Sequence, residues 1–575
     1  MKAFPSIPVL RSALVALVAL TPLCVGRGGG PATPSSVAVA PPSADELPLH
    51  REVVRFPRLA SAARPARVIP PTAAGGPGQL APRITTIMHA SPYRHGAWGL
   101  LEVDPTTGRV IHALSPDRFF MPGSTAKVFS VSAALDALGF AHRFTTPVYA
   151  HGAVVDGTLT GSLVLVAQGD LTMGGRTKPD GSVDFTNNLD HGDANALPGA
   201  TLTPENPLAG LNQIARQVRA SGITAIHGDV VIDDRLFQPD PNFAPTPDPI
   251  IINDNLIDVV ITPGRPGQPP TSVTWRPQVA PYHLEAQVTT VAAGQPTTVQ
   301  VQTFPDGRVL VSGQIAADAG PVLRTGPVVD PAAFARTALI EALGRAGVSV
   351  SAPPTGPNPA GLLPAQRSYQ GDHRVAAYVS PPFREYAKLI LKVSHNLGAN
   401  LVVCLMAVKA GSTDCGDGFA VMRSFFARAH VDRNQLMLAD GDGGNPVNRV
   451  TPRAAVALLR YWLARPEGAA FRHLLPDLGV DGTLASVART SPAKGRVFAK
   501  TGTLVAYDPL NARLSVVKAL AGYLEVRPGR VDVFDLVVND AAVSGITGVL
   551  VKVNDDLGAI AALLQQEAAR GRGHM

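Results

Sequence analysis

The chain has 575 residues, more than one ordinary hydrophobic core accommodates, so we expect two or three domains. Hydrophobic residues make up 45% and charged residues 16%, and this composition excludes a mainly disordered protein. The formal net charge is +6, but no run of lysine and arginine is longer than a pair. A scattered positive charge suits an anionic cell-wall polymer as well as nucleic acid, so charge does not decide between these partners.

The first 26 residues have the pattern of a bacterial signal peptide. Lys2 and Arg11 precede an apolar run over 13–25, which is shorter than the ~20 residues of a membrane-spanning helix. The residues before Cys24 lack the small residue of a lipoprotein signal. We therefore expect 1–26 to be a signal peptide or an uncleaved anchor, and the protein to be secreted across the bacterial inner membrane into the periplasm or cell envelope.

The next segment, 27–82, is rich in Pro, Ala and Gly and is predicted to be a disordered stalk. After it, 98–103 and 109–114 have the pattern of two strands joined by a turn. A helix with a buried apolar face is predicted over 124–138.

Further along, short strand-like runs such as 163–167 and 229–233 alternate with Gly/Pro turns. Helical patterns are expected over 208–220, 331–346, 382–409, 416–429, 452–464 and 554–569, and strands over 519–526 and 531–538. The order predicts a catalytic domain of residues 83–146 plus 372–575, split by an inserted, β-rich accessory part of residues 147–371.

Two cysteines, Cys404 and Cys415, remain beyond the predicted signal peptide. In a secreted protein such a pair is either a disulfide or two buried thiols. A bridge closing this short loop would stabilise the fold by roughly 3 kcal/mol.

Three short motifs follow one another in a fixed order: Ser124-Thr-Ala-Lys127, Ser394-His-Asn396 and Lys500-Thr-Gly502. The Ser-x-x-Lys spacing occurs twice more, but Ser491–Lys494 contains a proline that spoils a helical turn. The other copy, Ser515–Lys518, has neither of the later motifs downstream. The ordered set therefore identifies Ser124 as the candidate nucleophile.

The chemistry explains these residue types. Lys127 lies one helical turn after Ser124 and reaches its hydroxyl, and an uncharged lysine can take the serine proton. Burial or a neighbouring positive charge, for which Lys500 is the candidate, would lower the lysine pKa enough. Ser394 could relay a proton to the leaving amine, and Asn396 could hold the substrate or Lys127.

The third motif suits substrate binding. Lys500 and Thr501 match a carboxylate, and Gly502 permits a peptide to lie along a strand edge. The backbone N–H of Ser124, at a helix N-terminus, could stabilise an oxyanion.

The three motifs resemble those of the penicillin-recognising serine enzymes. The gap of 270 residues between Ser124 and Ser394, together with 226–234 and 479–484, is similar to the D-Ala-D-Ala carboxypeptidase/endopeptidase branch, the class C low-molecular-mass penicillin-binding proteins. The resemblance implies an α+β fold: a penicillin-binding-protein/β-lactamase-like transpeptidase domain, with an antiparallel sheet flanked by helices and a large β-rich insertion.

The same resemblance implies an activity. We expect hydrolysis of peptidoglycan stem peptides through an acyl-enzyme on Ser124, with β-lactams as acylating inhibitors and without a cofactor. It also implies that the N–H groups of Ser124 and Thr503 form the oxyanion hole, so Thr503 joins Thr501 and Gly502 among the predicted substrate-binding residues. No nucleic acid is expected as a partner.

Two departures leave alternatives open. The related enzymes often have Asp-Gly-Ser-Gly-Leu-Ser where this chain has Asp440-Gly-Asp-Gly-Gly-Asn, and the segment between Thr503 and Ala519 is longer than usual. The alternatives are a β-lactamase or esterase, against which no Glu-x-x-Leu-Asn segment lies between the second and third motifs, and a weakly active wall-binding scaffold. The balance of carboxypeptidase and endopeptidase activity also stays open.

No metal site is expected. The loop at Asp440 fails the EF-hand spacing, because Asn445 stands where Gly is required and Thr451 where Glu is required. No His-Glu-x-x-His pair occurs, and the cysteines lack zinc spacing. His395 is predicted to be structural or at the cleft edge, and the acids Asp170, Asp233 and Asp234 to be turn or cap residues.

Overall fold

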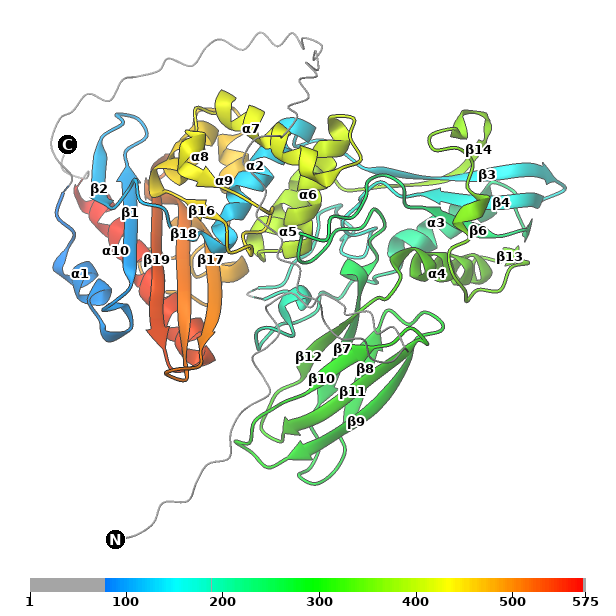
Figure 1. Ribbon diagram of the computed structural model, residues 1–575, viewed down its shortest axis with the longest axis horizontal. Coiled ribbons are helices and arrows are strands. Elements are labelled where there is room, and N and C mark those ends of the chain that lie inside the picture. The colour runs from blue at the N-terminus through cyan, green and yellow to red at the C-terminus, as the bar shows by residue number, and fades with distance from the viewer. Residues whose placement is uncertain (1–77, 188, 572–575) are drawn as a thin grey trace, which may run out of the picture. The chain divides into compact units, whose positions relative to one another are not determined.

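The computed structural model describes residues 78–187 and 189–571 (Figure 1). The predicted signal peptide lies outside them, as does most of the predicted stalk. The last residues of that stalk belong to the fold, because Gly78 N donates to Ile111 O and helix α1 (Pro82–Met88) begins at Pro82.

The catalytic part is built on a five-stranded sheet in which every neighbouring pair is antiparallel. Its order is β17 (Val497–Asp508), β18 (Arg513–Arg527), β19 (Arg530–Val543), β1 (Ala97–Val103) and β2 (Val110–Leu114). The predicted strands at both ends of the chain are thus confirmed, and β1 pairs with β19 to join the two halves. The long segment after Thr503 extends the β17–β18 hairpin to Asp508 and Arg513.

Side chains of this sheet enter two different cores because they alternate along each strand. Leu520 and Phe534 pack with α1 and α10 (Asn554–Gly571). Their neighbours Ala521 and Val533 pack on the opposite face with the other helices (Figure 1). The sheet is therefore covered on both faces, as the resemblance implied.

The helices of the second core come from both halves of the catalytic part. They are α2 (Lys127–Leu138), α5 (Phe383–Lys392), α6 (Asn396–Lys409), α7 (Gly418–Arg428), α8 (Pro452–Leu463) and α9 (Gly468–Arg472). The helical stretch expected over 382–409 is two helices, and Ser394 lies in the break between them with a positive φ of 64°. His395 then caps α6, since its side chain accepts a hydrogen bond from Gly398 N.

The insertion contains the predicted helices α3 (Ala209–Ala220) and α4 (Pro331–Arg345) and a six-stranded sheet. The strands of this sheet are β3 (Thr145–Val155), β4 (Thr158–Val166), β5 (Ala225–His227), β6 (Val230–Asp233), β13 (Ser349–Val350) and β14 (His373–Val379). Two three-stranded sheets follow the order β12 (Val322–Pro327), β7 (Leu256–Thr262), β8 (Ser272–Arg276) and β10 (Gln300–Thr303), β11 (Arg308–Ala316), β9 (His283–Val291).

The ends of the insertion lie side by side. Strand β14 pairs with β3, with Val379 opposite Thr145, although the sequence placed the boundary at 371 and so assigned β14 to the catalytic part. Because β3 and β14 are neighbours in one sheet, the chain leaves α2 and returns to α5 at nearly the same place.

Cys404 and Cys415 form a disulfide, which confirms the bridged alternative. It joins α6 to the short helix at Cys415–Asp417. Among the described residues, no helix is both long and apolar enough to cross a membrane.

Replacing both cysteines by alanine is expected to lower the free energy of unfolding by roughly 3 kcal/mol, because the closed loop restricts the unfolded chain. Chemical denaturation of the wild type and of the double variant Cys404→Ala/Cys415→Ala measures this difference. A reducing agent should lower the stability of the wild type but leave the double variant unchanged; equal responses would contradict the prediction.

Candidate active site

Ser124 lies in a 3-10 turn (Gly123–Ala126) that leads into α2, and Lys127 is the first residue of that helix. One turn of helix brings the two side chains together, and Lys127 Nζ lies 2.8 Å from Ser124 Oγ. Lys127 is 0% exposed, so its nitrogen is held inside the protein. The predicted nucleophile and base therefore meet.

Lys127 Nζ contacts two further oxygens. It donates to Asn396 Oδ1 at 2.6 Å and to the backbone oxygen of Asp442 at 2.8 Å. Neither oxygen carries a hydrogen, so both can only accept. An uncharged Lys127 amine therefore donates its two N–H groups to them. The lone pair of the nitrogen then faces Ser124 Oγ, which is the geometry of a general base.

Burial is the main physical reason for an uncharged Lys127. It lowers the pKa of Lys127, while the negative charges of Asp442, Asp193 and Asp440 act in the opposite direction. The prediction that Lys500 supplies the charge that lowers this pKa needs correction. Lys500 is itself 0% exposed, and burial together with the charges of Lys127 and Lys518 holds its own pKa well below the usual range.

The first and third motifs touch through their glycines. A Cβ atom on Gly123, whose φ is +51°, would lie 2.8 Å from Thr503 N, and one on Gly502 would lie 2.2 Å from Pro122 O. Any side chain at either position would push β17 away from the serine turn. This close packing places the backbone of Thr503 against the serine turn.

The third motif lies on β17, an edge strand that pairs with β18 and whose outer edge is bridged at its start by Asp477, opposite Phe498. Lys500 Nζ donates to Thr501 O at 2.7 Å, and the Thr501 hydroxyl lies 2.8 Å from that of Thr483. Across the hairpin, Lys518 Nζ donates to Thr503 Oγ1 at 2.8 Å. Ala499 N still donates to Pro476 O, so the candidate position for an added peptide strand is the outer edge of β17 beyond Ala499.

The loop at Asp440 is the third segment that contacts Lys127, after the serine turn and the start of α6. Asp440 Oδ1 accepts from Gly443 N, and Oδ2 accepts from Asn445 N, so the carboxylate organises its own turn. This confirms the predicted turn. A Cβ on Gly443 would lie 2.0 Å from Gly123 O, which shows how tightly the loop packs on the serine turn.

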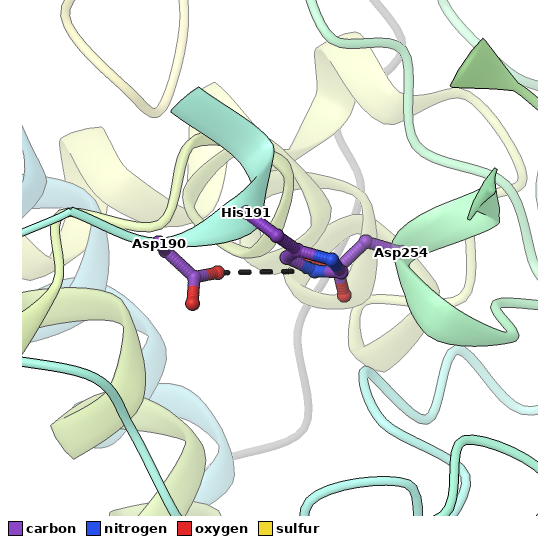
Figure 2. A group of neighbouring side chains, drawn as sticks. All are labelled: Asp190, His191 and Asp254. Atoms are coloured by element: carbon purple, nitrogen blue, oxygen red, sulfur yellow. Dashed lines mark hydrogen bonds and ion pairs between the residues drawn. The ribbon is translucent and has the colours of Figure 1, made fainter. Parts of the chain in front are cut away.

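A buried ionic network from the insertion lies next to the second motif. Figure 2 shows Asp190, His191 and Asp254 pointing toward one another. His191 Nδ1 lies 2.7 Å from Asp258 Oδ1, and His191 Nε2 lies 2.7 Å from Asp254 Oδ2. On the other side of Asp254, His395 Nε2 lies 2.6 Å from the same Oδ2. The middle residue of the second motif is therefore structural, as predicted, and it binds the insertion.

This network has the donors of a metal site, since the ligand atoms of Asp190, His191 and Asp254 lie within 4.8 Å of one another. However, Arg176 forms two hydrogen bonds with Asp190 at 2.8 and 2.6 Å, and Arg276 binds Asp258. Burial opposes charge on His191, but the attraction of Asp258, Asp254 and Asp190 outweighs it and raises the His191 pKa to about 10.

With His191 protonated, the two arginines and the imidazolium balance the three carboxylates of Asp190, Asp254 and Asp258. The cluster then has no excess negative charge to offer a cation, and both His191 nitrogens are occupied. We therefore interpret it as an ion-pair network and not as a metal site.

Two acids near the lysines were not foreseen. Asp193 is partly buried and interacts electrostatically with Lys127 and Lys500, and desolvation raises its pKa to about 6. Burial likewise raises the pKa of Asp442 to about 7. Asp170 behaves as predicted, because its carboxylate accepts from the backbone N–H groups of Thr172 and Met173 in a turn.

Comparison with known proteins identifies the family of the chain. A model of the D-Ala-D-Ala carboxypeptidase 3 (S13) family matches residues 83–554. The chain belongs to this family. It is a serine-type peptidase, and the family predicted from the motifs is confirmed.

Individual relatives of this S13 chain are distant in sequence. It is 28% identical over 451 residues to the D-alanyl-D-alanine carboxypeptidase of an Actinomadura species, covering 74% of each protein. It is 26% identical over 450 residues to a carboxypeptidase of Mycobacterium tuberculosis, covering 77% of this chain and 76% of that protein.

Among solved structures, penicillin binding protein 4 of Haemophilus influenzae is similar, with a TM-score of 0.62 at 20% identity. The match covers 84% of this chain and 99% of that one. It confirms the predicted penicillin-binding-protein-like fold.

Asp442 stands where the related enzymes often have serine, and its negative charge should lower the fraction of Lys127 that is uncharged at a given pH. Ionised Asp442 raises the pKa of Lys127, so Asp442→Ser is expected to lower that pKa and to move the acidic limb of the pH–rate profile to lower pH. The measurement is the rate constant of acylation by a labelled penicillin between pH 5 and 9. Asp442→Asn should give the same shift and the exposed control Asp306→Asn none; an unmoved limb in both Asp442 variants would contradict the prediction.

The imidazolium of His191 should make stability depend on pH. Its pKa is raised in the folded protein to about 10, against about 6.5 in the unfolded chain, so its contribution is complete below pH ~6.5 and is lost as pH rises toward 10. His191→Asn should cost about 3–5 kcal/mol near pH 6, because it removes one of the three buried positive charges that balance Asp190, Asp254 and Asp258. Denaturation of both proteins at several pH values should show this difference shrinking as pH rises; a constant difference would refute it.

Proposed function

We propose that this S13 protein hydrolyses D-Ala-D-Ala peptides of peptidoglycan through an acyl-enzyme on Ser124, as a carboxypeptidase, an endopeptidase or both. The observation that supports this proposal best is the position of Lys127 Nζ. It lies between the Ser124 hydroxyl and two carbonyl oxygens that can only accept, so its lone pair is directed at the nucleophile.

In the acylation step, Ser124 Oγ attacks the carbonyl carbon of the penultimate D-Ala while Lys127 takes the hydroxyl proton. The negative charge on the carbonyl oxygen is stabilised by the N–H groups of Ser124 and Thr503. When the C–N bond breaks, the proton passes to the leaving amine, directly from Lys127 or through Ser394. In the second step, water gives a proton to Lys127 and attacks the ester, which releases the peptide and restores Ser124.

The substrate would lie along the outer edge of β17, beyond the bridge between Phe498 and Asp477. Thr501 and Thr503 offer hydroxyls to the carboxylate beside the scissile bond, Gly502 leaves room for the peptide backbone, and Asn396 can hold the peptide as well as Lys127. A crystal structure of Haemophilus influenzae penicillin binding protein 4 contains a β-lactam. We infer that β-lactams, whose strained amide imitates the peptide, acylate Ser124 in the same way.

The function places the protein outside the cytoplasm. Peptidoglycan lies beyond the inner membrane, and the signal-peptide pattern of residues 1–26 supports secretion into the periplasm or cell envelope. Contact with the membrane would then be limited to an uncleaved N-terminal anchor.

Incubation with a labelled penicillin, followed by mass spectrometry of the peptides, tests the proposal. We expect a stable adduct on Ser124, its absence in Ser124→Ala, and normal labelling of the exposed control Ser424→Ala. Release of D-Ala from a pentapeptide should fall by about a thousandfold or more in Ser124→Ala, because nucleophile and base act as a unit.

Other outcomes would support the alternatives. Rapid release of the opened drug would indicate a β-lactamase, and no adduct at any drug concentration would favour a wall-binding scaffold. Cleavage of a cross-linked peptide dimer, set against D-Ala release from the pentapeptide, separates endopeptidase from carboxypeptidase.

A further inference from the structure

Three lysine side chains are buried around the first and third motifs. Lys127 and Lys500 are 0% exposed, and Lys518 is 6% exposed. Within residues 78–187 and 189–571, the lysines that form ion pairs are others: Lys178, Lys388, Lys392 and Lys552. Nearby carboxylates act on Lys127 and Lys500, whereas burial alone acts on Lys518. A buried ammonium without a counter-ion costs free energy, so an anion from outside the protein would stabilise charged Lys518.

The three lysines differ in how well they keep a positive charge. Burial lowers the pKa of Lys127, and burial with two neighbouring lysines lowers that of Lys500 well below its usual range. Burial alone lowers the pKa of Lys518, to about 8, so this side chain is mostly protonated at neutral pH. Lys518 is thus the cation that remains when Lys127 acts as a base.

Lys518 lies directly behind the third motif. It is opposite Thr503 in the β17–β18 pairing, and its Nζ donates to Thr503 Oγ1 at 2.8 Å. Because that oxygen already accepts from an ammonium, the hydroxyl hydrogen of Thr503 is directed to another acceptor. Thr501 and Thr503 are two residues apart on one strand and so point to the same face.

The position of Lys518 on a strand excludes a second serine–lysine pair of nucleophile and base. Ser515 and Lys518 repeat the Ser-x-x-Lys spacing, but both lie on β18. Residues three apart on a strand point to opposite faces, so this pair cannot act as nucleophile and base.

We infer that Lys518 is a specificity-determining residue: through the Thr503 hydroxyl it holds the free carboxylate adjacent to the bond that is cut. In a stem peptide this is the carboxylate of the residue that leaves, and in a penicillin it is the ring carboxylate. The inference rests on the proposed function, since it assigns a role within the same substrate site.

Acylation by benzylpenicillin and by its methyl ester tests this role, since the ester lacks the carboxylate charge. Lys518→Met should slow acylation by the acid about tenfold or more and leave acylation by the ester nearly unchanged. Lys518→Arg, which keeps the charge, should preserve the preference for the acid. The exposed control Lys494→Met should match the wild type with both compounds, and circular dichroism checks that each variant is folded.

Each other result has a definite meaning. Equal slowing with acid and ester would show that Lys518 only supports the β17–β18 hairpin, and unchanged rates in Lys518→Met would also overturn the inference. A wild-type protein that neither compound acylates would instead overturn the proposed function, and the inference with it.

Discussion

The proposed active site depends on one buried nitrogen, Lys127 Nζ, and on the three oxygens around it. One of them belongs to the same helical turn, while Asn396 and Asp442 are 269 and 315 residues away in sequence. A lysine in this position can act as a base only if it loses its charge, and burial favours that loss by lowering its pKa. The rest of the fold must therefore close three distant segments around one side chain and exclude water from it.

Two strand pairings bring these distant segments together. The first is the pairing of β1 with β19, which joins the halves of the sheet. The second is the pairing of β3 with β14, which brings the two ends of the insertion together, so that its size does not disturb the distance between α2 and α6. Glycines then permit the final contacts, because Gly123, Gly443 and Gly502 each lie where a Cβ would collide with the backbone of a neighbouring segment.

Local patterns carried the sequence-based predictions that the structure confirms. The one-turn spacing of Ser124 and Lys127 and the alternation along β18 and β19 depend on near neighbours, so they can be derived without tertiary contacts. The missed features depend on burial. Nothing in the sequence marks Asp442 as buried or places Asp193 near Lys127, and the charge state of Lys500 follows from which groups surround it. The sequence could also not pair His191 with acids that follow it by more than sixty residues.

Two hydrogen bonds of His395 explain why the middle residue of the second motif is a histidine. His395 Nδ1 accepts from Gly398 N, so the ring hydrogen is on Nε2 and is donated to Asp254 of the insertion. The histidine thereby caps α6 and binds the ionic network at the same time, and Asn396, the next residue, presents its side-chain oxygen to Lys127. Because Asn396 directly follows a residue held by Asp254, the insertion helps to fix the position of the catalytic motif, and its conformation contributes to the geometry around the base.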